Sequence, residues 1–136
     1  HPITRNSPQS APPDRTPPVG YTHATAARGQ RIIHVSGQVA YGADGKILGH
    51  GDLKRQTETA YENLSSALAA ADASLSDVVK TTIYVVDYKP SDLAVIREVR
   101  FRFFGRENLP ANTLVGVQAL AAEGLMIEIE ALAVTD

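Results

Sequence analysis

Two carboxylates on one predicted strand are the first candidates for chemistry. Glu128 and Glu130 stand in the stretch LMIEIEAL, where all other residues are apolar. Residues two apart in a strand face the same side, with side chains roughly 7 Å apart at the usual strand rise. The plain alternative is that both carboxylates face solvent. If their face is buried, at least one must find partners or have its pKa raised, which is what a general base requires.

An arginine cluster on one predicted helix is the second candidate: Arg97, Arg100, Arg102 and Arg106. Most such clusters are a solvated basic face, here partly balanced by nearby glutamates. Arg100 is the exception, because its spacing from Ile96 and Phe103 puts it near the apolar side of the helix. An arginine in that position usually extends its charged end to the surface or binds a carboxylate of a neighbour or a ligand.

Other catalytic signatures do not occur in the sequence. The four histidines show no metal-ligand spacing, so we expect no metal site. The stretch GADGKILGHG lacks the lysine-serine end of a phosphate-binding loop, and Ser36 has no G-x-S-x-G context. There is no cysteine, which excludes disulfides, zinc thiolate sites and thiol catalysis.

Composition indicates an ordinary globular protein. The chain has 136 residues, of which 43% are hydrophobic and 21% charged, as in a single soluble domain. A net charge of −2 gives no general attraction to nucleic acid or anionic membranes. No apolar run reaches the roughly 18 residues of a membrane span. With no signal-peptide core we expect a cytoplasmic protein, and the start HPITRNSP indicates a processed end or a tag remnant.

The N-terminal region differs from the rest of the chain. Residues 1–18 hold six of the eight prolines and show no hydrophobic periodicity, so we interpret them as a flexible arm before one domain at 19–136. Two strand-like runs follow, at 21–28 and 31–40. The sequence Arg28-Gly29-Gln30 between them predicts a hairpin.

Two helices and three further strands are predicted downstream. Apolar residues three or four apart predict a helix over about 52–72, with Asp52 as its N-cap. A second helix begins at Pro90 and ends near Gly105. Runs rich in apolar and β-branched residues predict strands at 77–87, 112–120 and 125–134.

This β-β-α-β-α-β-β order predicts an α+β domain whose two helices cover only one face of a sheet. Strand parity assigns residues such as Val35, Ile83, Val115, Val117 and Ile129 to the covered face. The other face carries a mixture that includes His34, Val78, Tyr84, Asn112, Leu114 and Glu128. Such a mixture suits a surface buried against other copies, with polar pockets between them. We therefore expect a homo-oligomer.

Several segments together resemble the Rid family (reactive intermediate deaminase, also called YjgF-like or L-PSP-type). They are GYTHA, VSGQVA, the run from QTETAY to IYVVD, LPANTLVGVQAL and MIEIEALAV, and they span about residues 20–134. The resemblance implies a chorismate-mutase-like α+β fold assembled as a homotrimer, with a ligand cleft at each subunit interface. It also implies hydrolysis of enamines and imines to a keto acid and ammonia without a cofactor.

The resemblance also implies roles for individual residues. The family's water-orienting glutamate falls on Glu128, its cleft aromatic on Tyr21 and the backbone of its SGQ segment on Gly37. The arginine that binds the substrate carboxylate falls on Asn112 and is therefore missing. A family cysteine falls on Leu114.

The missing arginine bears directly on the reaction. A charge-assisted arginine–carboxylate contact is worth about 1.5–3 kcal/mol. Its loss would weaken binding of a 2-imino acid roughly ten- to a hundred-fold. Arg97, which falls on a cleft asparagine of the family, or Arg100 could restore the charge from the opposite wall.

Three functions remain open at this stage. The first is cofactor-independent hydrolysis of an imine or enamine, distinct from the standard 2-imino acid deaminase. The second is a trimer that binds a small metabolite without turning it over. The third, ribonuclease activity, comes from older family naming and has only the arginine cluster in its favour, so we expect no nucleic-acid partner.

Overall fold

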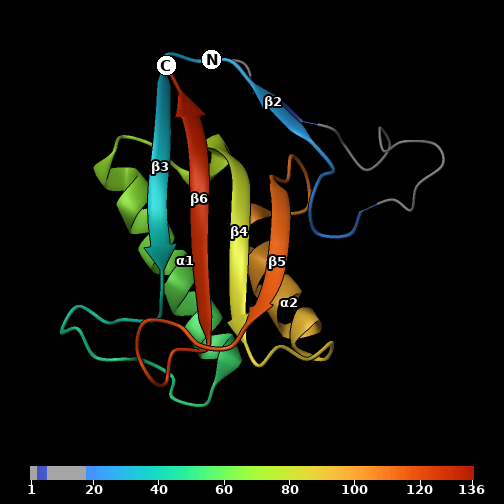
Figure 1. Ribbon diagram of the computed structural model, residues 1–136. Helices are drawn as coiled ribbons and strands as arrows, with labels where there is room; N and C mark the ends of the chain where they lie inside the picture. The colour runs from blue at the N-terminus through green and yellow to red at the C-terminus, as the bar shows by residue number, and fades with distance from the viewer. Residues whose placement is uncertain (1–2, 6–17) are drawn as a thin grey trace.

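The computed structural model describes residues 3–5 and 18–136. Its centre is a four-stranded mixed sheet in the order β3-β6-β4-β5. The bounds of these strands are Arg31–Gln38 for β3, Val78–Val86 for β4, Ala111–Val117 for β5 and Ile127–Thr135 for β6. β4 runs parallel to β5, and the other neighbours pair antiparallel. Figure 1 shows both α-helices behind this sheet, so one face is covered and the other is open.

The helices form where the periodicity predicts them. α1 spans Leu53–Ala70, α2 spans Asp92–Phe104, and a short 3-10 helix, η2, spans Leu75–Asp77. The Asp52 side chain accepts a hydrogen bond of 3.0 Å from the Arg55 amide, which confirms it as the N-cap of α1. α2 ends at Gly105, whose φ of 74° suits glycine.

The hydrophobic core lies between the two helices and the covered face of the sheet. Its fully buried members come from both layers and include Leu64, Leu68, Ile83, Ile96, Ile127 and Ile129. The predicted α+β architecture, with two helices on one face of a mixed sheet, is therefore confirmed.

The predicted faces of β5 are wrong. Asn112, Leu114 and Gly116 pair in register with Thr81, Ile83 and Val85, which lie on the covered face. Leu114 packs against the core, whereas Val115 is 38% exposed on the open face. β5 is an edge strand with apolar residues on both sides, so hydrophobic parity does not determine its facing. A register irregularity between Val78 and Lys80 likewise buries Val78, which was predicted on the open face.

The predicted hairpin is also wrong. β2 is short, Thr25–Ala27, and pairs with β1, Ile3–Arg5, in a separate two-stranded sheet rather than with β3. Between β2 and β3 the chain passes close to the end of β6 at Gly29. A Cβ at this position would lie 2.5 Å from the Thr135 carbonyl oxygen, so glycine permits the close approach. Of the predicted flexible arm, residues 1–2 and 6–17 lie outside the described residues.

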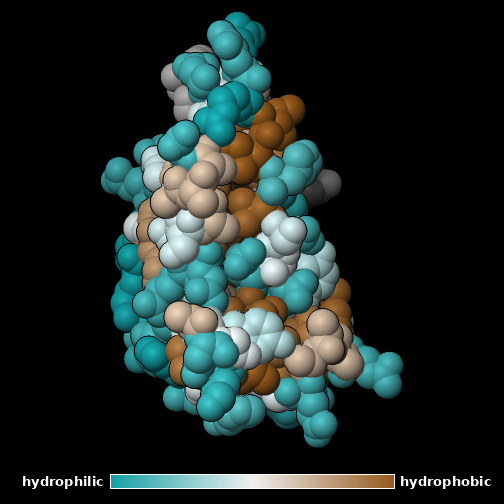
Figure 2. Space-filling view, turned by 90° about the vertical axis from the view of Figure 1, so that its left-hand side faces the viewer, coloured by the Kyte–Doolittle hydropathy of each residue, from teal (hydrophilic) through white to brown (hydrophobic). Residues whose placement is uncertain are grey.

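The open side of the sheet exposes apolar as well as polar groups. Ile32 on β3 is 65% exposed. Figure 2 views the molecule from its α1 and β3 side, where hydrophobic patches interrupt a mostly hydrophilic surface. In the described part of the chain, no helix has the length and hydrophobicity that crossing a membrane requires.

Candidate functional site

A pocket of about 240 Å³ lies between α2, the first residues of β5 and the segment at 19–21. Its lining consists of Val19, Tyr21, Leu93, Arg97, Arg100, Asn112 and Leu114. The structure thus brings together five residues that the sequence singled out: Tyr21, Arg97, Arg100, Asn112 and Leu114. They come from three separate stretches of the chain, which meet at the β5 edge of the sheet.

Backbone contacts hold the 19–22 segment beside β5. The Thr22 amide donates to the Pro110 carbonyl at 3.1 Å, and Thr22 forms an isolated parallel bridge with Ala111. Gly20 has a φ of 82°, and a Cβ there would lie 2.7 Å from Arg100 Nη2. Glycine therefore lets the backbone pass directly over the guanidinium, which puts Tyr21 at the pocket.

Arg100 is buried and forms no ion pair with the described residues. Arg100 is 2% exposed, and its Nε and Nη1 atoms have no hydrogen-bond partner in the described part of the chain. Burial lowers the pKa of the guanidinium, and the charge of Arg97 lowers this pKa further. Arginine nevertheless stays charged. A buried charge without a partner is unfavourable, so this arrangement suits a pocket that receives an anion.

Buried polar atoms without partners gather around this point. Within residues 3–5 and 18–136 they are Tyr61 Oη, Arg97 Nε, Arg100 Nε and Arg100 Nη1. Tyr61 is fully buried and stacks on Phe103 at a centroid distance of 5.2 Å. Burial raises the pKa of Tyr61, and the Arg100 charge opposes that rise. Buried polar groups in folded proteins nearly always have partners, so this local exception points to a binding site.

Asn112 contributes neutral donors to the pocket. Its Oδ1 accepts a hydrogen bond of 2.6 Å from Oγ1 of Thr81, which is fully buried. With the carbonyl end held in this way, the Nδ2 end provides two donors for a ligand. Leu93 and Leu114 add an apolar wall.

Gly37 and Glu128 form a second group on the open face of the sheet. A Cβ at position 37 would lie 2.4 Å from Glu128 Cδ, so only glycine lets the carboxylate take this position. A register irregularity in β3 between Val35 and Gln38 contains Gly37. On the same face the Tyr84 hydroxyl donates to Glu130, and this hydrogen bond raises the pKa of Tyr84.

The two groups do not meet within one chain. Asn112 lies on β5 and faces the helices, whereas Glu128 lies on β6 and faces the open side. β4 separates these two strands. A single chain therefore carries two separate halves of the site that the sequence predicted.

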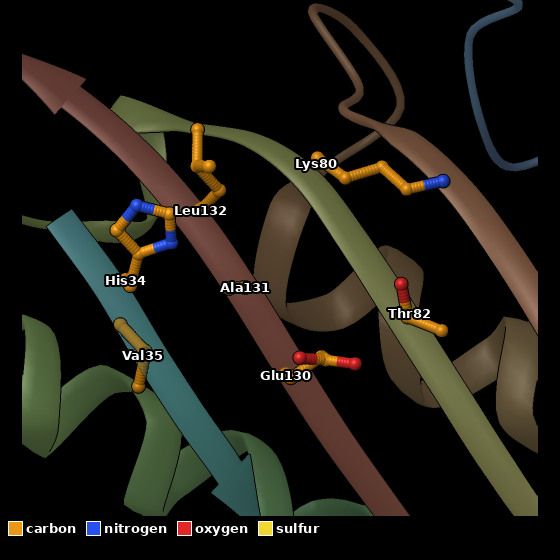
Figure 3. Close-up of a pocket in the computed structure, with 7 residues that line it drawn as sticks. All are labelled: His34, Val35, Lys80, Thr82, Glu130, Ala131 and Leu132. Carbon is orange, nitrogen blue, oxygen red and sulfur yellow. The ribbon is translucent and has the colours of Figure 1, made fainter. Parts of the chain in front are cut away.

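The open face has a shallow pocket of its own, of about 200 Å³. Figure 3 shows His34 on β3, Glu130 on β6 and Thr82 on β4 as side chains of adjacent strands around it. Lys80 also lines this pocket and donates to Thr113 Oγ1 at 2.6 Å. This face is polar at its centre.

The arginine cluster does not form one basic surface. Arg102 pairs with Glu58, and Arg106 lies 4.0 Å from the centroid of the Phe101 ring. Arg100 is buried. The described residues contain no group of three or more His, Cys, Asp or Glu side chains that could hold a metal ion.

Sequence reasoning missed several residues around the edge pocket. Val19 and Leu93 line it, Thr81 orients Asn112, and Tyr61 lies beneath Arg100. The signal for Thr81 was weak, because a threonine in a β-branched strand is ordinary. Val19 could have been found from its position next to the candidate Tyr21.

The fold and the edge pocket define a small α+β protein with a pocket lined by two arginines at the sheet edge. The family model described as Endoribonuclease L-PSP matches residues 12–135. The chain therefore belongs to this family, which confirms the resemblance noted in the sequence.

Individual relatives agree with this assignment. A RutC family protein of Pyrococcus abyssi is 37% identical over 116 residues, which cover 85% of this chain and 87% of the relative. The 2-iminobutanoate/2-iminopropanoate deaminase of Rattus norvegicus is 36% identical over 104 residues, covering 76% and 73%. The crystal structure of a Rid protein from Yersinia pestis matches with a TM-score of 0.81 and 41% identity, covering 85% and 86%.

Proposed function

We propose that the protein is a cofactor-independent hydrolase of a small imine or enamine metabolite. Three copies of this chorismate-mutase-like domain assemble as a homotrimer, and each cleft lies between two copies. The buried Arg100, whose Nε and Nη1 have no partner in the described chain, is the observation that carries the proposal. The rat relative named as an iminobutanoate and iminopropanoate deaminase supports the reaction class.

Arg100 takes the role of the missing family arginine. The resemblance puts Asn112 where the family binds a carboxylate, and Asn112 has no charge. Arg100 reaches the same pocket from α2 and supplies that charge. Asn112 Nδ2 then donates a second, neutral hydrogen bond to the substrate.

Glu128 of a neighbouring copy supplies the other half of the chemistry. Its carboxylate accepts a hydrogen bond from a water and orients that water toward the imine carbon. The water oxygen bonds to this carbon while the nitrogen takes up a proton. The C–N bond of the resulting carbinolamine then breaks, giving a keto acid and ammonia. Overall one imine and one water give one keto acid and one ammonia, so no cofactor is required.

The test generates 2-imino acids in situ with an amino acid oxidase and traps unreacted imine with semicarbazide. Added protein is expected to reduce semicarbazone formation and to accelerate keto-acid release. Glu128→Gln should remove this acceleration, and Arg100→Met should reduce it roughly ten- to a hundred-fold. Arg106→Met, just beyond the end of α2 and outside the edge pocket, is the matched control and should retain activity.

A different result would favour the binding function. If the unmodified protein accelerates no imine yet binds keto acids, the trimer is a metabolite-binding module. If Asn112→Arg then creates activity, the fold supports hydrolysis and only the carboxylate-binding residue at position 112 is lacking. Activity that persists in Glu128→Gln would contradict the assigned role of Glu128.

A further inference from the structure

We propose that the edge pocket binds two acidic groups of one ligand, so that its substrate class is the 2-imino dicarboxylic acids, the imines of acidic amino acids. The inference rests on the proposed function for the imine chemistry. Its own support is a separate observation, because two arginines, Arg97 and Arg100, line a single pocket of about 240 Å³.

The pocket holds two positive charges and no negative one. None of its lining residues is acidic. Three buried nitrogens of these arginines have no hydrogen-bond partner in residues 3–5 and 18–136. They are Arg97 Nε, Arg100 Nε and Arg100 Nη1. One carboxylate can satisfy one guanidinium through two parallel hydrogen bonds. The second arginine then needs a second anionic group.

Nearby carboxylates are already engaged elsewhere. Glu98 lies 3.7 Å from Lys54 Nζ, and Glu58 pairs with Arg102. Asp92 accepts a hydrogen bond of 2.9 Å from the Lys89 amide at the start of α2. Among the described residues, none of these three carboxylates forms an ion pair with Arg97 or Arg100.

The two arginines lie at different depths. Arg100 is almost completely buried beneath Gly20, so it holds the inner carboxylate together with Asn112. Arg97 lies one turn earlier on α2 and also lines an outer hollow, which places it at the mouth of the pocket. The other residues around that hollow are Ala94, Glu98, Phe101, Arg102 and Arg106. Arg97 therefore holds the distal carboxylate, and the carbon chain between the two groups contacts the leucines of the wall.

A competing explanation is that Glu128 of a neighbouring copy neutralises Arg97. In the proposed reaction that carboxylate holds the water, and a direct pair with Arg97 would compete with this role. The two explanations differ in the ligand preference that they predict, so binding can decide between them.

The experiment measures binding of stable keto acids to the full chain by isothermal titration calorimetry. 2-Oxoglutarate and 2-oxopentanoate share a carbon skeleton and differ only in the distal carboxylate. We expect 2-oxoglutarate to bind at least roughly ten-fold more tightly. Arg97→Gln should reduce this ratio to about one while leaving 2-oxopentanoate binding unchanged. Arg28→Gln, with the same charge change at an exposed position that lines neither hollow, should preserve the ratio.

Several results would overturn the inference. One is that 2-oxoglutarate binds no more tightly than 2-oxopentanoate. Another is that Arg97→Gln leaves the ratio of the two affinities unchanged. A third is that Arg97→Gln loses the trimer, which would make Arg97 the partner of Glu128. Inorganic phosphate that binds as tightly as 2-oxoglutarate would assign the arginine pair to a phosphate instead.

These measurements are independent of turnover. A dicarboxylate preference without hydrolysis of any imine would refute the proposed function and leave the ligand class standing. Hydrolysis of imines without a dicarboxylate preference would support the proposed function and refute the inferred ligand class.

Discussion

Arg100 occupies a position where its charge is expected to reduce stability. Its side chain occupies the inner face of α2 beside Ile96 and Val99, both fully buried. An apolar side chain at this position would bury well, whereas the arginine leaves two nitrogens without partners. Functional sites often retain such unfavourable groups because binding requires them. In the proposed function, a bound ligand supplies the counter-charge that the described residues do not give Arg100.

Replacing Arg100 with methionine should make the protein more stable and weaken ligand binding. The variant removes a buried charge and its unpaired donors, which is expected to raise the free energy of unfolding by about 1–3 kcal/mol. Urea denaturation at matched protein concentration measures this change. Arg106→Met, over the Phe101 ring, should shift it by less than about 0.5 kcal/mol. A clear loss of stability in Arg100→Met would instead show that Arg100 is structural.

Sequence reasoning identified these residues better than it placed them. Helical spacing correctly predicted that Arg100 lies on the apolar side of α2, because burial on a helix follows a fixed period. The spacing did not reveal that Arg100 shares a pocket with Asn112, since that contact depends on how α2 packs against β5. The face of Asn112 was wrong because an edge strand with apolar residues on both sides has no clear parity.

Gln56 connects three elements through one side chain. It is fully buried on α1, and its Nε2 donates to the carbonyls of Gly49 at 3.1 Å and Gly124 at 2.9 Å. Its Oε1 accepts from the Met126 amide at 2.8 Å. These bonds hold the loop before α1 and the start of β6, the strand that carries Glu128. Gln56 thereby fixes the position of a catalytic candidate from a distance.

Replacing Gln56 with leucine should destabilise the protein strongly. The substitution removes the hydrogen-bond partner of two carbonyls and one amide in partly buried positions, at an expected cost of about 2–4 kcal/mol in the free energy of unfolding. The matched control is Gln118→Leu, at an exposed position. Thermal or urea denaturation of both variants provides the comparison. Equal stability of the two would show that the Gln56 bonds contribute little net free energy.

Elements whose sequence pattern is local could be predicted, whereas pairings that depend on long-range contacts could not. α1, α2, β4 and β6 follow from periodicity and β-branched runs, which are local properties of the chain. Gln56 shares a helix face with Leu53 and Ala60, and a polar residue there is the signal that could have revealed it. The pairing of β2 with β1 could not be predicted, because residues Ile3–Arg5 carry no strand pattern of their own.

The whole molecule explains why the candidate site is split. Arg100 on α2 and Asn112 on β5 line the edge pocket on the covered side of the sheet, whereas Glu128 and Gly37 lie on the open face. That face exposes Ile32 and Val115 beside polar groups, a mixture typical of a subunit interface. In a cyclic trimer each copy presents both halves to different neighbours, so every cleft is completed once. Assembly and catalysis are therefore coupled in the proposed function.

Mixing two inactive variants should restore activity if each cleft is shared between copies. In a trimer that combines Glu128→Gln chains with Arg100→Met chains, some clefts pair an intact Arg100 with an intact Glu128. Random assembly from equal amounts leaves about a quarter of the clefts complete, so co-refolded mixtures should recover about that fraction of imine hydrolysis. The control mixes Glu128→Gln with a chain that carries both substitutions, which leaves no complete cleft and should stay inactive. Light scattering should give three times the 14.5 kDa chain mass for each mixture. If the mixtures are trimeric but recover no activity, the two residues do not act in one shared cleft. A shared cleft requires the quarter of clefts that hold an intact Arg100 and an intact Glu128 to be active.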